Sequence, residues 1–261
     1  MEAASAAPAA DKRRHPFPWL NLMATEPFYL LHFLLFFSYL GARSSASQTL
    51  SADLVDRLFR REIQAILAFV VLVAVKMVKE ETWEAFVANT LLYAKGFLLA
   101  IALVIDYHLA LCYLLGFLVI SIITQQPPYD GLGDCSQLTP LQLESLLTEG
   151  STSRFWLVEF RALCSSTCVQ KCRIFPDLSV IYSNKNISFG VVDIGHFPNA
   201  AEKFGISLPG QIPTYILFDN AVEVARLPEF SYTEASVPTI SKKLLCQHFE
   251  LDRRLIQYVS E

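Results

Sequence analysis

The chain has 261 residues, of which 53% are hydrophobic and 18% are charged, a balance that excludes a disordered or fibrous protein. With 21 basic against 25 acidic residues, the formal net charge is −4. Composition therefore gives no electrostatic basis for nucleic-acid binding, and no nucleic-acid partner is expected. Six cysteines are too few for a disulfide-built mini-domain. Nearly all of the excess apolar residues precede Thr124, which indicates a membrane region.

Residues 1–45 are expected to form an N-terminal signal or membrane anchor. The basic stretch Lys12-Arg13-Arg14-His15 precedes an apolar run from Phe28 to Leu40, and small residues follow at Ser44 to Ser47. This order is typical of a secretory signal. An uncleaved membrane helix from about Trp19 to Leu40 explains the same residues, and the sequence leaves both alternatives open.

Residues 46–126 are predicted to form membrane helices, so a lipid bilayer is an expected partner. Ile63–Val75 is short for a span, at roughly 13 residues, although flanking Lys and Arg side chains can reach the headgroups. Phe97–Ile123 as one helix would be about 40 Å long, enough to cross a bilayer with tilt. The alternative is two helices that meet at Asp106. At least one true span is predicted here, and Asp106 is expected at the headgroup boundary.

Residues 127–138 contain the prolines and glycines of a stiff, exposed linker. Residues 139–261 then alternate between helical and strand patterns, which predicts an α/β domain with a mixed sheet of four to five strands and flanking helices. The expected helices are Leu141–Gly150, Ser165–Tyr182, Ala200–Phe204 and Thr239–Gln247, and the expected strands are Phe155–Phe160, Ile187–Ile194, Thr214–Phe218 and Val222–Leu227.

Three motifs in this domain resemble the thioredoxin family. Val158–Cys168 predicts a strand that leads into a helix with a cysteine in its first turn, Phe189–Ile194 resembles the family's central strand, and Gln211–Thr214 is similar to the Ile-Pro-Thr motif that contains its cis-proline. Together with the apolar region in front, they make the chain resemble the thioredoxin-related transmembrane proteins, including an atypical form with serine in place of the first active-site cysteine. The resemblance implies a thioredoxin-like fold, a location in the endoplasmic reticulum membrane, and a role in redox regulation or protein folding.

The resemblance also implies three site residues near the start of the helix. Ser165 occupies the position of the first active-site cysteine, and Cys168 that of the second. Because a hydroxyl cannot form a disulfide, full dithiol–disulfide oxidoreductase activity is not expected. Cys168 is the candidate single thiol and is expected to be the most reactive cysteine of the domain, Glu159 is the candidate buried acid, and Ser165 is predicted to cap the helix by accepting from the Cys168 amide. In the alternative, Cys164, Cys168 and Cys172 are packing residues.

Ile212, Pro213 and Thr214 are the candidate binding residues. The resemblance implies a cis bond between Ile212 and Pro213, placed beside the Ser165–Cys168 loop, where an extended segment of a partner protein would bind. Protein thiols or extended peptides are thus the expected protein partners, and neither a metal nor another cofactor is expected. Two functions remain open: redox regulation through one cysteine, and a non-catalytic module that recruits a partner to the membrane.

Two positions depart from the family's pattern. Arg173 replaces a proline normally found five residues after the second cysteine, which predicts a straighter helix after Cys168. The chain ends in Ser260-Glu261 where a dilysine retrieval signal would be expected. For the orientation, Lys12-Arg13-Arg14 favours a cytosolic N-terminus if it is retained. An even number of crossings would then place the domain in the cytosol, and an odd number would place it in the lumen.

Overall fold

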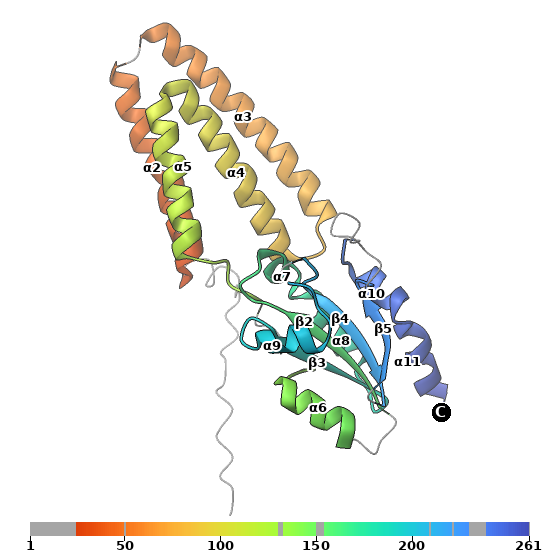
Figure 1. The fold of residues 1–261 in the computed structure, drawn as a ribbon. Helices are drawn as coiled ribbons and strands as arrows, with labels where there is room; N and C mark the ends of the chain where they lie inside the picture. Colours follow the sequence, from red (N-terminus) through yellow and green to blue (C-terminus); the bar gives the residue numbers. More distant parts are fainter. Residues whose placement is uncertain are drawn as a thin grey trace, which may run out of the picture.

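The computed structural model has an α-helical part followed by an α/β domain (Figure 1). Residues 1–24, with the basic stretch and Trp19, lie outside the residues that it describes. The described residues are 25–49, 51–129, 133–149, 154–208, 210–220, 222–229 and 239–260.

In the described residues, the helical part consists of four helices that run in alternating directions (Figure 1). They are α2 (Pro27–Thr49), α3 (Ala52–Lys79), α4 (Trp83–Ile105) and α5 (Tyr107–Ile123). Among the described residues, α4 is the one helix long and apolar enough to span a membrane, and α5 is apolar but shorter. Ser44–Ser47, the small residues that follow the apolar run, lie inside α2.

The apolar region ending at Ile123 is broken at Asp106, which confirms the two-helix alternative over a continuous Phe97–Ile123 helix. Asp106 has an extended backbone, with φ −161° and ψ 136°, and it ends α4. Its carboxylate accepts from the His108 amide at 3.2 Å and thereby caps α5. Since α4 begins at Trp83, well before Phe97, the sequence also misplaced the start of this apolar helix.

The α/β domain has a five-stranded mixed sheet in the order β1-β3-β2-β4-β5, which confirms the predicted thioredoxin-like fold. The strands are β1 (Cys135–Gln137), β2 (Phe155–Arg161), β3 (Ile187–Asp193), β4 (Thr214–Asp219) and β5 (Val222–Leu227). β1, β3 and β2 are parallel, while β4 and β5 are antiparallel to their neighbours. β1 falls inside the segment predicted as linker, because three residues at a sheet edge are too short to give a strand pattern.

The helices of the domain cover both faces of the sheet around two apolar clusters (Figure 1). On one face Leu157 and Phe189 pack with residues of the helices at the C-terminal end, and on the other Val158 and Phe160 pack with the helices that follow β1 and β3. The domain's helices are α6 (Pro140–Glu149), α7 (Ser166–Lys171), α8 (Ile174–Tyr182), α9 (Pro198–Lys203), α10 (Lys242–His248) and α11 (Leu251–Ser260).

The predicted helix Ser165–Tyr182 is interrupted at Cys172 and Arg173, so the expectation of a straighter helix was wrong. Pro176 explains the interruption. It has no amide hydrogen to donate to the Cys172 carbonyl, and its ring would clash with that group in a continuous helix. The terminal helix α11 was not predicted; its apolar residues Leu251 and Leu255 pack on the core that contains Phe175.

Candidate functional site

The candidate site begins where β2 ends and α7 starts. Ser165 has the extended backbone of an N-cap residue, with φ −90° and ψ 125°, and its amide donates to the Ala162 carbonyl at 2.9 Å. The predicted side-chain cap is wrong, since the Ser165 hydroxyl makes no capping hydrogen bond. It lies instead near the Cys168 thiol and lowers the pKa of that group.

Cys168 is almost completely buried, with 1% of its surface exposed. Burial raises the pKa of its thiol, and hydrogen bonds with the Ala162 backbone and Ser165 offset only part of this effect. The sequence argument rested on an acidified thiol in the first turn of a helix. A buried thiol with a raised pKa has the opposite properties, so the structure gives Cys168 no advantage in reactivity over the exposed Cys164.

Cys164 should therefore react with an alkylating agent before Cys168 and Cys172 do. Cys164 is exposed, whereas the other two are buried and the pKa of Cys172 is raised to about 11 by burial. In the native chain we expect Cys164 to label at least about tenfold faster, and all three to label alike in denaturant. Mass spectrometry of labelled peptides over time measures the three rates. Equal or faster labelling of Cys168 in the native chain would restore it as the reactive thiol.

Glu159 lies on β2 beneath the α7 loop and is 1% exposed. The Tyr215 hydroxyl donates to its Oε1 at 3.0 Å, and Arg161 Nη1 lies 3.8 Å from its Oε2. Burial raises the pKa of the Glu159 carboxyl to about 7, although Arg161 and the Tyr215 hydrogen bond both act to lower it. A carboxyl with that pKa exchanges a proton near neutral pH, and its negative charge also raises the pKa of Cys168.

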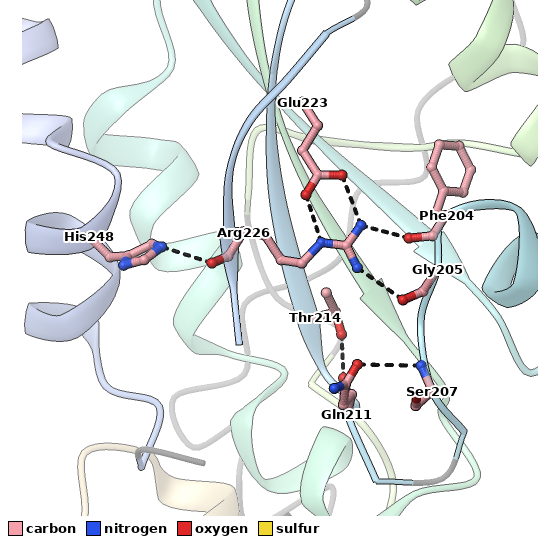
Figure 2. Close-up of polar contacts among 8 residues, drawn as sticks. All are labelled: Phe204, Gly205, Ser207, Gln211, Thr214, Glu223, Arg226 and His248. Carbon is pink, nitrogen blue, oxygen red and sulfur yellow. Dashed lines mark hydrogen bonds and ion pairs between the residues drawn. The ribbon is translucent and has the colours of Figure 1, made fainter. Parts of the chain in front are cut away.

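The Ile212–Pro213 peptide bond is cis, as the Ile-Pro-Thr motif indicated. The preceding turn is held by hydrogen bonds of Gln211: its side-chain Oε1 accepts from the Ser207 amide at 3.4 Å, and its backbone carbonyl accepts from the Thr214 hydroxyl (Figure 2). The Gln211 backbone amide also donates to the Ser207 carbonyl at 3.0 Å. Thr214 is buried, so it supports the turn from below and is not available for contact with a partner.

Arg226 of β5 fixes the segment that leads into this turn (Figure 2). Its guanidinium pairs with Glu223 at 2.7 Å and donates to the carbonyls of Phe204 and Gly205 at 2.6 and 3.1 Å. Its own carbonyl lies 2.9 Å from His248 Nε2. The network ties β5, α10 and the end of α9 together, which holds the Ile212 turn in place.

The Ser165 loop and the Ile212–Pro213 turn meet at a groove with a volume of about 280 Å³. We call this the cis-proline groove. Cys168, Glu159 and Thr214 do not line it. The sequence missed most of its walls, because those residues carry no motif and come from segments remote in the chain. The lining residues are Ser165, Thr167, Lys171, Gly210, Gln211, Ile212, Pro213, Pro228, Thr239 and Ile240.

The groove lies next to the turn between α3 and α4. The Thr82 hydroxyl accepts from the Ala85 amide at 3.3 Å, which caps α4, and donates to the Gln170 carbonyl of α7 at 2.7 Å. Glu81 Oε2 accepts from the Lys242 amide at 3.1 Å. The α/β domain is thus attached directly to the start of the apolar helix.

Comparison with known proteins confirms the resemblance to thioredoxin-related transmembrane proteins. The chain is 29% identical over 227 residues to "Thioredoxin-related transmembrane protein 2 homolog" of Drosophila melanogaster, covering 80% of this chain and 82% of the relative. It is 29% identical over 222 residues to "Thioredoxin-related transmembrane protein 2" of Xenopus tropicalis, covering 81% and 77%. The homologue of Caenorhabditis elegans is 27% identical over 191 residues, covering 71% of each chain. No family model matches the chain.

Among solved structures, thioredoxin NaTrxh from Nicotiana alata covers 47% of this chain and 98% of its own, with a TM-score of 0.36 and 15% identity. Schistosoma mansoni thioredoxin covers 45% and 94%, with a TM-score of 0.34 and 24% identity. Both scores are below 0.5, so the fold assignment rests on the strand order and register described above.

Proposed function

We propose that this chain is a membrane-anchored, thioredoxin-like protein of the endoplasmic reticulum whose cis-proline groove binds an extended segment of a partner protein without thiol–disulfide turnover. The observation that carries the proposal is the composition of the groove. It contains a hydroxyl at the attacking position, Ser165, while the nearest cysteine of the motif, Cys168, lies outside it and is buried. The proposed compartment rests on the family resemblance alone.

The groove suits an extended backbone. Among the described residues, none donates to or accepts from the backbone of Ile212, so its amide and carbonyl are available to a bound strand. Ile212, Pro228 and Ile240 offer apolar contacts, and Ser165 and Thr167 offer hydroxyls. Main-chain hydrogen bonds would supply affinity, and the apolar walls would select side chains.

Blocking the groove tests this function. Linear peptides of about ten residues, selected from a displayed library on the full chain in detergent, should bind with an affinity that Thr167→Arg weakens at least about tenfold. Thr167 is exposed and lines the groove, so an arginine there fills the space without disturbing the core. Thr148→Arg, on the exposed face of α6, is the matched control. Failure to select any binder, or equal binding by Thr167→Arg, would exclude a peptide groove here.

A second candidate function, redox regulation through Cys168, is favoured by the acid beside it. Glu159, with a pKa of about 7, is suited to accept the Cys168 proton near neutral pH. The thiolate could then attack a disulfide of a partner protein, forming a mixed disulfide with one partner cysteine and releasing the other as a thiol, but only if the groove opens to the buried sulfur. Trapping of the native chain with an oxidised peptide separates the two functions, because only this one requires a disulfide at Cys168.

We further propose that α4 and α5 anchor the chain in the membrane. Many large apolar side chains of these helices are exposed, among them Leu103, Leu111 and Ile122, and a bilayer would cover them. The two helices are antiparallel (Figure 1). If both cross the bilayer, the chain returns to the side on which α4 begins, and the α/β domain lies on that side. With a cytosolic N-terminus, as the basic stretch favours, that side is the cytosol.

The chain should remain in the membrane pellet after alkaline carbonate extraction, and protease added to sealed microsomes should degrade the α/β domain. Both results follow from a hairpin anchor with a cytosolic domain. Detergent-permeabilised microsomes and a lumenal marker protein give the controls. A soluble chain after carbonate treatment would contradict the anchor, and protection of the domain until detergent is added would place it in the lumen.

A further inference from the structure

Arg161 is a buried cation whose hydrogen-bonding capacity is largely unused. Its residue surface is 8% exposed, and its Nε is buried with no hydrogen-bond partner. Within the described part of the chain its one charged contact is Glu159, at 3.8 Å, which is too long for a hydrogen bond. A guanidinium has five N–H donors, and buried donors of folded proteins are almost always paired. The described residues offer Arg161 only the Oε2 atom of Glu159, which is itself buried without a hydrogen bond, so most donors of the guanidinium are free for a bound group.

The Arg161 side chain lines a cavity of about 680 Å³ that is separate from the cis-proline groove. The cavity lies at the carboxyl ends of three adjacent parallel strands, since Gln137, Arg161 and Asp193 end β1, β2 and β3. Ligands of open α/β sheets commonly bind at this edge. We call it the Arg161 cavity.

The other wall of the Arg161 cavity comes from the helical part. Glu26 directly precedes α2, and Pro127, Pro128 and Tyr129 follow shortly after the end of α5. The start of α2 and the end of α5 therefore lie at this wall of the cavity. Under the membrane anchor proposed above, the cavity lies at the surface of the bilayer, within reach of lipid headgroups.

The charges in the cavity define what it can hold. Asp193 is already satisfied, because its carboxylate accepts from the Gly195 amide at 2.8 Å and lies 3.0 Å from His196 Nδ1. Glu26 is half-buried and has no side-chain partner among the described residues. One cation, Arg161, and one carboxylate, Glu26, thus remain for a ligand, a combination that matches a zwitterion.

We propose that the Arg161 cavity binds the phosphoethanolamine group of a zwitterionic phospholipid. The phosphate oxygens accept hydrogen bonds from the guanidinium of Arg161. A guanidinium is planar and can donate two parallel N–H bonds to two phosphate oxygens. The ammonium group pairs with Glu26 at the side of the cavity formed by the helix ends. Free phosphoethanolamine carries the same phosphate and ammonium groups, so the experiment tests both the lipid and the free molecule.

The test uses the full chain in a maltoside detergent, which contains no phosphate. Native mass spectrometry measures retention of phosphatidylethanolamine, with phosphatidylglycerol as the lipid that lacks the ammonium, and ligand-observed NMR measures binding of free phosphoethanolamine and inorganic phosphate. We expect phosphatidylethanolamine to be retained, and Arg161→Met to weaken its binding at least about tenfold. Arg253→Met, which removes an exposed arginine from α11, should have no effect.

Glu26→Gln keeps the test informative if Arg161→Met does not fold. We expect it to weaken phosphatidylethanolamine binding while leaving phosphatidylglycerol binding unchanged. Binding of free phosphoethanolamine as tight as that of the lipid would support the site and identify a soluble ligand as its source. Equal retention of both lipids by the wild-type chain, no binding of any probe, or unchanged binding by a folded Arg161→Met variant would overturn the proposal.

Discussion

Replacing Ser165 with cysteine should convert the chain into a dithiol oxidoreductase. The Ser165 side chain is already close enough to the Cys168 thiol to lower its pKa, so a thiol in its place can form a disulfide with Cys168 after small rotations. Glu159 lies beneath the pair as a proton acceptor with a pKa of about 7. We expect insulin reduction to rise from an undetectable rate to one well above background, measured with the full chain in detergent.

The position of the new thiol is the essential variable in this experiment. Ser166→Cys introduces a cysteine one residue later, on the exposed side of α7, and should give no disulfide with Cys168 and no turnover. Ser165→Cys with Cys168→Ser should be inactive as well. A Ser165→Cys variant that forms no disulfide under oxidising conditions would show that the loop holds the two positions apart.

Replacing Glu159 with glutamine should stabilise the chain at alkaline pH. The carboxyl has a pKa of about 7 in the folded chain against an ordinary value of 4.5, so the folded state binds more protons than the unfolded state between these two pH values. Stability of the wild-type chain therefore falls as pH rises through this window and stays lower above it. The full difference corresponds to roughly 3 kcal/mol, of which glutamine should recover about 2 kcal/mol at pH 8, because the contact with Arg161 is lost.

Urea unfolding of the detergent-solubilised chain at several pH values measures this effect. The advantage of Glu159→Gln should shrink steadily as pH falls and disappear about one pH unit below 4.5, where the wild-type carboxyl is protonated in both states. Glu202→Gln, which removes an exposed side chain from α9, should follow the wild type throughout. A difference that does not change with pH would mean that the carboxyl is not destabilised by burial.

The parts of the fold that the sequence predicted correctly are those with a local signature. The alternation of strands and helices and the Ile-Pro-Thr motif were sufficient for the sheet and the cis bond at Pro213. The helix break after Cys168 also had a local cause. A straighter helix was expected because position 173 is arginine instead of proline, whereas Pro176 is the proline that breaks the helix. β1 was missed because a short edge strand is defined by its pairing with β3, which no local pattern records.

The site was less predictable, because burial depends on distant parts of the chain. The first-turn position of Cys168 was visible in the sequence, but its burial among neighbouring elements was not, and burial reverses the expected shift of its pKa. Glu159 and Arg161 stand two residues apart on β2 and share a face by the strand period, but the predicted strand ended at Phe160 and so left Arg161 out. Only the tertiary structure shows that Arg161 lines a cavity. The other wall of that cavity comes from residues just before α2 and just after α5.

The two hydrogen bonds of the Thr82 hydroxyl affect which partners the cis-proline groove can reach. Because the same group caps α4 and binds the α7 backbone, the α/β domain is held directly against the start of α4, the helix proposed as part of the anchor. With α4 in the bilayer as proposed, this contact would set the height and orientation of the domain, and the cis-proline groove would stay within a thin layer next to the membrane. Segments of other membrane proteins that emerge within this layer are present there at a high effective concentration, whereas a soluble chain must first diffuse into it.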